Sequence, residues 1–316
     1  MPGILTIAKK EFTDHVSDNT FLLIFGVLLI VMVAGAYVFV LNIQDWAYQA
    51  ILRRDLEEAS LAWKIYGPEF TNLVAEPFAL FGVLVAIVLS FNSLNKERSE
   101  GSLKVLLSYP ISKGKLIVGK LIGGLLVVVL VTLVSMTISF SIIIYYLAIP
   151  VTIDYLSRVA SITFLGIVLL FFYLCVGTAV SVMITDASAA LMGILLITVA
   201  LRPDFITMLL TIVSGVSNFV GITFRLPENM SYYPGGNFYW NTNTRNFWIL
   251  SPPQAFLGFS SNIFRFVNPS GYPTVYIPLE FEWLLPKSID LVQSMIVLAA
   301  VSLVICCILF VRREIS

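Results

Sequence analysis

The chain has 316 residues, of which 58% are hydrophobic and 12% are charged. A soluble globular domain has roughly twice that charged fraction, so the composition indicates an integral membrane protein. The basic and acidic residues balance to a formal net charge of zero, which argues against a nucleic-acid partner. The three cysteines lie in apolar runs without the spacing of a metal site, and we expect them to be small core residues.

The first twenty residues predict an amphipathic helix that lies along the membrane surface. Ile4, Ala8, Phe12 and Val16 recur at steps of four, with charged residues between them. The only histidine, His15, has no second ligand nearby, so we expect a surface or interface side chain.

Six apolar stretches follow, and about twenty residues are enough to cross a bilayer core. The expected transmembrane spans are 21–41, 77–94, 121–149, 159–185, 187–201 and 291–311. The sequence leaves open whether 205–224 spans the membrane, re-enters it or lies on the outer surface. We therefore expect an all-α integral membrane protein in which 1–316 is a single transmembrane domain. Its sizeable outer segments would be 42–76 and, between the last two spans, 202–290.

Charge placement predicts the orientation. With six spans, both termini face the same side as the polar segment 95–120, and Lys and Arg are roughly three times as dense on that side. The positive-inside rule makes that side cytoplasmic, in a multi-pass protein of the cell membrane. The spans as drawn contain no ionisable residue, and a charge at mid-membrane costs about 3 kcal/mol on insertion scales. Energy for transport is therefore expected to come from outside this chain.

The polar segment Asn95–Lys120 predicts a short amphipathic helix followed by a bend. Glu97, Glu100 and Lys104 share one helical face, and a group of leucines shares another. Pro110 ends the helix. A short charged helix held between two spans is an element that a partner on the cytoplasmic side could move.

Two shorter motifs are weak. Gly114–Lys120 matches the first seven positions of a phosphate-binding loop, but Leu121 stands where a Ser or Thr would hold magnesium, and we interpret the match as chance. Asn229 begins a glycosylation sequon on the expected outer side, which by itself says little.

The segment 97–120 resembles the signature that follows the second span in permeases of the type-2 ABC exporter family. That signature is roughly Glu-Arg, Gly-Thr-Leu, Leu-Leu, Pro, Ser-Lys and Gly-Lys. The matching positions in this chain are Glu97-Arg98, Gly101-Ser102-Leu103, Leu106-Leu107, Pro110, Ser112-Lys113 and Gly119-Lys120. The opening segment 7–12 also looks like the first helix of that family, although Asp18 and Asn19 stand where the family often has basic residues.

The resemblance implies a permease that works as a dimer, with each half docked to a separate cytoplasmic ATPase subunit. We expect a homodimer, while the sequence leaves open whether the second half is identical. ATP and magnesium would bind that partner, so this chain would hold no cofactor, metal or catalytic residue and would not itself be an enzyme. The helix between spans two and three would be the coupling helix. The residues implied as ATPase contacts are Glu97, Arg98, Glu100, Gly101, Leu103, Lys104 and Leu107, with Pro110 fixing the bend into span three.

The outer region is rich in aromatic residues, among them Tyr232, Tyr233, Trp240 and Trp248. They could form an exit gate or a binding surface for an apolar or carbohydrate substrate. The favoured interpretation is an aromatic cluster at the membrane interface, where Trp and Tyr are enriched.

Two other classes of function stay open. A membrane anchor that transmits force to an outer partner without transport would suit the large outer segments 42–76 and 202–290. An ion-coupled secondary transporter would need buried ionisable residues or broken repeats, and the sequence shows neither. The sequence does not identify a transported substrate.

Overall fold

The structure is a computed structural model, and it describes residues 3–52, 70–99, 113–147, 151–184, 186–201, 251–263, 266–267, 277–278 and 281–312. Its helices are α1 (Ile4–Val16), α2 (Asn19–Leu52), the π-helical turn η2 (Thr71–Ala75), α5 (Glu76–Ser99), α7 (Lys113–Leu147), α8 (Ile153–Met183), α9 (Ala187–Ala200), α12 (Pro252–Ile263) and α13 (Phe281–Arg312). Two short strands, β1 (Phe266–Val267) and β2 (Ile277–Pro278), pair antiparallel.

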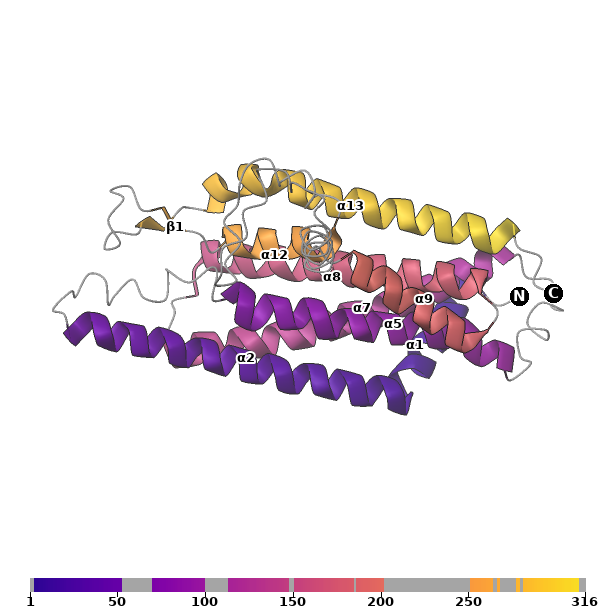
Figure 1. Ribbon diagram of the computed structural model, residues 1–316, viewed down its shortest axis with the longest axis horizontal. Helices are drawn as coiled ribbons and strands as arrows, with labels where there is room; N and C mark the ends of the chain where they lie inside the picture. Colours follow the sequence, from indigo (N-terminus) through magenta and orange to yellow (C-terminus); the bar gives the residue numbers. More distant parts are fainter. Residues whose placement is uncertain are drawn as a thin grey trace, which may run out of the picture.

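Long helices lie side by side and form an elongated bundle (Figure 1). Within the described residues, five helices are long and apolar enough to cross a membrane: α2, α5 with η2, α7, α8 and α13. Many of their residues are β-branched, which weakens helices in water. In hydrocarbon, however, every backbone N–H and C=O must be paired within the segment, and a helix achieves this. The structure thus agrees with an all-helical, multi-pass membrane protein.

Three of the expected spans, 21–41, 77–94 and 291–311, fall inside these long helices. The expected spans 121–149 and 159–185 overlap α7 and α8, which begin earlier and end at Leu147 and Met183. The remaining one, 187–201, coincides with α9, which has only 14 residues. At 1.5 Å per residue α9 is about 21 Å long, shorter than a hydrocarbon core of about 30 Å. Among the described residues there are therefore five membrane-length helices, where six had been expected.

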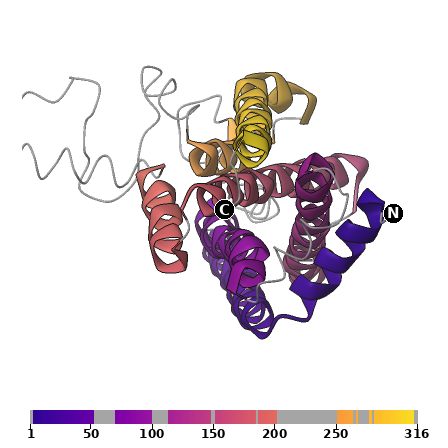
Figure 2. The same ribbon diagram turned by 90° about the vertical axis from the view of Figure 1, so that its right-hand side faces the viewer.

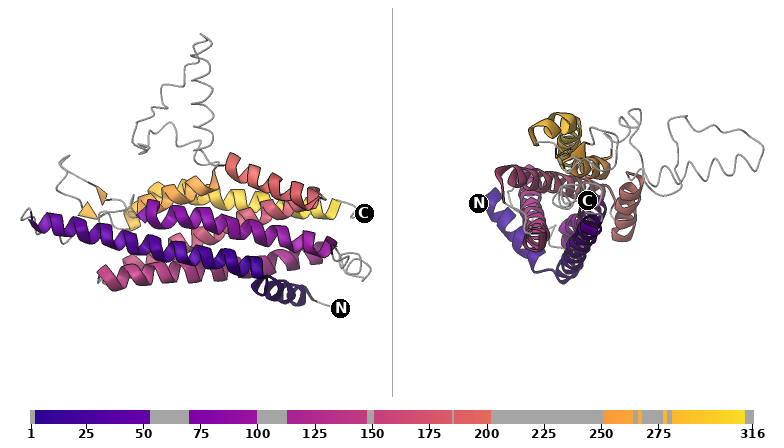
Figure 3. Two further views of the ribbon diagram at one scale, coloured as in Figure 1. Left: turned by 60° about the horizontal axis from the view of Figure 1, so that its bottom comes forward. Right: turned by 90° about the vertical axis from the view of Figure 1, so that its left-hand side faces the viewer.

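Both chain termini lie at one end of the bundle, which we call the terminal end (Figure 3). The same end contains α1, the last turn of α5, the first turn of α7 and the last turn of α13 (Figure 1). The two helix ends that flank residues 100–112 are therefore at the terminal end, as the predicted topology requires.

Helix α8 is the centre of the packing, because it contacts α5, α7, α9, α12 and α13. Small residues allow the close approaches. A Cβ added at Gly177 of α8 would lie 2.0 Å from Ser90 Oγ of α5, so the two backbones meet there with no room for a side chain. Close helix contact through small residues is typical of membrane bundles, where the hydrophobic effect does not drive helices together.

Helix α12 is short and buried within the bundle. Ser251 precedes it and Pro252 occupies its first position, where the missing proline N–H has no cost. Phe256, Phe259 and Ile263 are almost fully inaccessible, and the helix packs against α13, α8, η2 and α5. The expected outer segment 202–290 thus contains a buried helix. The sequence did not predict this helix, because it shows no clear period in that segment.

Candidate functional site

Most of the residues expected to contact an ATPase lie outside the described part of the chain. Glu97 and Arg98 are in the last turn of α5. Glu100, Gly101, Leu103, Lys104, Leu107 and Pro110 are outside the described residues, as are the possible outer-gate residues Tyr232, Tyr233, Trp240 and Trp248. The roles given to these residues stay predictions.

The best-defined polar site lies next to this segment, where α1 packs against the first turns of α7. Two glycines of α7 form the contact. A Cβ at Gly119 would lie 2.7 Å from Ile7 Cγ2, and a Cβ at Gly123 would lie 2.6 Å from Glu11 Cβ and 2.8 Å from the Ala8 carbonyl oxygen. Because the two glycines are four residues apart, they share one helix face, and this spacing lets the two backbones approach closely.

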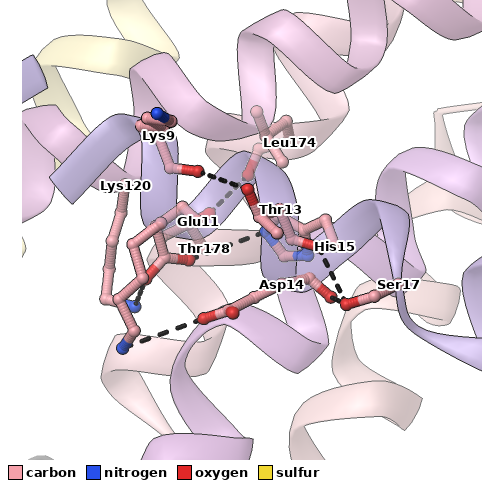
Figure 4. Close-up of polar contacts among 10 residues, drawn as sticks. Lys9, Glu11, Thr13, Asp14, His15, Ser17, Lys120, Leu174 and Thr178 are labelled. Atoms are coloured by element: carbon pink, nitrogen blue, oxygen red, sulfur yellow. Dashed lines mark hydrogen bonds and ion pairs between the residues drawn. The ribbon is translucent and has the colours of Figure 1, made fainter. Parts of the chain in front are cut away.

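An ion pair is buried at this contact (Figure 4). Lys120 Nζ of α7 donates a hydrogen bond to Glu11 Oε1 of α1 at 2.5 Å, and the two side chains are 1% and 6% exposed. His15 Nε2, one turn further along α1, lies 3.7 Å from Glu11 Oε2. Each charge would be costly to bury alone, so the two must stay paired while α1 covers α7.

The structure bears on three expectations about this region. His15 is buried at the interface of α1 with the bundle, which is one of the two environments expected for it. Helix α1 is helical as expected and buries Ile7, Ala8, Glu11 and His15 on the protein, while its position along a membrane surface stays a prediction. The segment 114–120 is helical, in agreement with the interpretation that its match to a phosphate-binding loop arose by chance.

The spans drawn from the sequence contained no ionisable residue, whereas two of the corresponding helices in the structure do. Lys120 and Arg158 had been assigned to loops, but both are buried residues within long helices. The spans had been drawn to begin just after these charges, whereas the helices begin earlier. The signals that could have located the site are Gly119 and Gly123 at a spacing of four, and Glu11 and His15 at a spacing of four on α1.

A two-residue turn, Ser17 and Asp18, joins α1 to α2. Ser17 Oγ donates to the Thr13 carbonyl oxygen at 2.8 Å and so extends the bonding of α1 (Figure 4). Asp18 Oδ1 accepts hydrogen bonds from the backbone N–H groups of Thr20 at 2.7 Å and Phe21 at 3.4 Å, which caps the start of α2. The connection is therefore short and hydrogen-bonded on both sides.

A second buried polar site holds α12. Arg158 Nε donates to Asp154 Oδ2 at 2.8 Å, and Arg158 Nη1 donates to the carbonyl oxygen of Ile263 at the end of α12. A guanidinium group at a helix C-terminus also interacts favourably with the helix dipole. Ser251 Oγ, at the other end of α12, donates to the Leu201 carbonyl oxygen at 2.5 Å.

No group of three or more His, Cys, Asp or Glu side chains that could hold a metal ion occurs within the described residues. The cysteines are free, with Cys175 and Cys306 buried. What these polar contacts do is fix helices relative to one another: α1 on α7 at the terminal end, and α12 on α8.

A bundle of membrane-length helices is the architecture of a multi-pass membrane protein. In the described part of this one, Glu11, Lys120 and Arg158 are buried and each has a charged partner. A family model described as "ABC-2 family transporter protein" matches residues 5–315. The chain therefore belongs to this family and is the membrane subunit, or permease, of an ABC transporter. This confirms the resemblance that residues 97–120 suggested. A comparison with curated proteins finds no match.

Proposed function

We propose that this permease is the membrane half of an exporter and that a separate cytoplasmic ATPase subunit moves it through residues 97–108. The observation that supports the proposal best is the position of the two helices that flank this segment. Helix α5 ends at Ser99 and α7 begins at Lys113, both at the terminal end of the bundle. A partner that binds between them would act on two membrane-length helices at once. ATP and magnesium belong to that partner, and a second copy of this chain completes the complex.

The terminal end is the cytoplasmic side in this proposal, because the density of Lys and Arg is higher there. The five membrane-length helices alone would leave the two termini at opposite ends. Since both termini lie at the same end, the chain returns along the bundle between Asp186 and Phe281. We propose that this return is the sixth crossing and that it is made in pieces, of which α9 and α12 are two.

A direct test removes the proposed coupling helix. The permease is produced together with its candidate ATPase subunit, and the ATPase that copurifies with the permease is measured. Deletion of residues 97–108, or the single change Leu103→Asp, is expected to abolish copurification while the permease still reaches the membrane. Lys10→Met serves as a matched control, because Lys10 is an exposed charge at the same end of the molecule. Full binding of the ATPase to the deletion variant would contradict the proposal.

One alternative function is also compatible with the structure, namely a membrane subunit that transmits force to an extracellular partner. Helix α2 has 34 residues, or about 51 Å at 1.5 Å per residue, against a hydrocarbon core of about 30 Å. It is therefore longer than the hydrocarbon core, and because it begins at the terminal end, we place its excess length at the opposite end. Reconstitution of the complex in vesicles distinguishes the two functions, because an exporter moves a substrate across the bilayer with this complex alone. Family membership favours both over an ion-coupled transporter.

A further inference from the structure

Two hydrogen bonds and one ring contact join the first and third membrane-length helices, α2 and α7, away from the terminal end. Ser139 Oγ donates to the Met32 carbonyl oxygen at 3.5 Å, and Gln44 Nε2 donates to the Tyr146 carbonyl oxygen at 3.4 Å. The rings of Tyr37 and Tyr146 also meet edge to face, with centroids 5.9 Å apart. All these residues lie in the middle or the far half of their helices.

At the terminal end, α1 lies against the outer side of α7 (Figure 2). It packs along the first turns of α7, and its C-terminal end leads directly into α2 (Figure 2). The only covalent path from α1 to α2 is the capped turn at Ser17 and Asp18. Helix α1 therefore joins the start of α7, which it contacts, to the start of α2, to which it is linked by the short capped turn.

The ion pair between Glu11 and Lys120 is the polar contact that joins α1 to α7. The stability of α1 on α7 does not require a charge pair, since apolar residues of similar size often replace a buried ion pair without loss. The best-attested use of such a pair is to fix one register among several. Register needs fixing here, because Gly119 and Gly123 present a surface without side chains along which α1 could slide.

We propose that Glu11 and Lys120 are positioning residues that make α1 a brace between the terminal ends of α7 and α2. Lys120 lies seven residues, or about two helical turns, after the start of α7 at Lys113. A displacement of that start is thus passed through the ion pair to α1, and through the turn at Ser17 and Asp18 to α2. The brace is a property of the permease alone. Its use in transport rests on the proposed function above.

The first experiment measures the brace without any partner. Spin labels are attached at Leu22→Cys on α2 and Lys115→Cys on α7, both exposed positions, after Cys175, Cys306 and Cys307 are replaced by Ala. Labelled chain is diluted into unlabelled chain, so that the distance within one chain is measured in lipid nanodiscs. We expect one narrow distribution for the native pair and a broadened or shifted one for Glu11→Gln and for Lys120→Met.

Two further variants separate positioning from stability. The double variant E11M/K120M removes both charges at similar volume, so its thermal stability should recover relative to the single variants while the distance distribution stays broad. The control K10M breaks the exposed pair between Lys10 and Asp14, 3.8 Å apart on the other face of α1, and should keep the native distribution. A narrow native distribution in E11M/K120M would overturn the proposal.

The second experiment asks whether the brace matters for coupling in the complete complex. E11M/K120M should bind the ATPase subunit at the native level, because residues 97–108 are unchanged, yet transport should no longer follow ATP hydrolysis. If transport by this variant follows ATP hydrolysis as it does in the native complex, the proposal that the brace acts in transport is wrong. The outcome is separate from the test of the proposed function, because loss of ATPase binding after deletion of residues 97–108 is measured independently of the distance between α2 and α7.

Discussion

The contact between α1 and α7 leaves no room for a methyl group at Gly123, and this makes a sharp prediction for Gly123→Ala. The added Cβ would lie 2.6 Å from Glu11 Cβ and 2.8 Å from the backbone oxygen of Ala8. Carbon atoms in normal contact are about 3.5–4.0 Å apart, so α1 must retreat by about 1 Å. The bond from Lys120 to Glu11 would then lengthen from 2.5 Å beyond the limit of about 3.2 Å for a good hydrogen bond.

The free-energy cost follows from three terms. Forcing an extra carbon into a packed site typically costs about 1–3 kcal/mol. Weakening a hydrogen bond to a charged group costs about 1.5–3 kcal/mol. Alanine is a better helix former than glycine by about 1 kcal/mol, which offsets part of the loss. We therefore expect Gly123→Ala to destabilise the folded permease by roughly 1.5–5 kcal/mol.

The matched control is Gly26→Ala in α2. A Cβ at Gly26 would meet no atom within 4 Å, so only the gain in helix propensity remains, and this variant should be as stable as the native protein or slightly more stable. Thermal unfolding of the three purified proteins in the same nanodiscs measures the difference. Equal melting temperatures for Gly123→Ala and Gly26→Ala would refute the argument that α1 and α7 are in close backbone contact.

Two further predictions concern the rest of the bundle. Gly177→Ala should disrupt the crossing of α5 and α8 and lower the amount of permease in the membrane, because its Cβ would lie 2.0 Å from Ser90 Oγ. A second change, Ser90→Gly, should restore that amount. Gly26→Ala as the second change should not restore it. Arg158→Met should release the C-terminus of α12, since the Ile263 carbonyl oxygen loses its donor. Hydrogen exchange measured by mass spectrometry should then be faster than in the native protein for peptides of α12, with a smaller change for peptides of α13. Unchanged exchange in α12 would contradict this role of Arg158.

The sequence predicted the elements that depend on local composition. Long uncharged runs located the membrane-length helices, because a helix is the way for such a run to satisfy its backbone in lipid. The segment around Glu97 and Arg98 was sufficient to identify the family, as the match over residues 5–315 confirms. The expected outer gate and most of the coupling residues lie outside the described residues, so those predictions stand as they were made.

The sequence did not predict the contacts that define the candidate site. Lys120 and Glu11 are 109 positions apart, and hydropathy ends a span at a charge regardless of the distant group that neutralises it. The same reason explains Arg158, whose partner at Ile263 is 105 positions away. A buried charge is identified only together with its partner, and that partner is a product of the tertiary fold.

The shortness of α9 and α12 affects how this protein can rearrange. A carbonyl oxygen at the end of a helix inside hydrocarbon needs a donor, and side chains supply one at Leu201 and another at Ile263. An uninterrupted helix can bend only by stretching its own ladder of main-chain hydrogen bonds. A segment divided into short helices can shift by exchanging one side-chain donor for another. A rearrangement of this divided segment would therefore have to exchange the hydroxyl contact of Ser251 and the guanidinium contact of Arg158 for other donors.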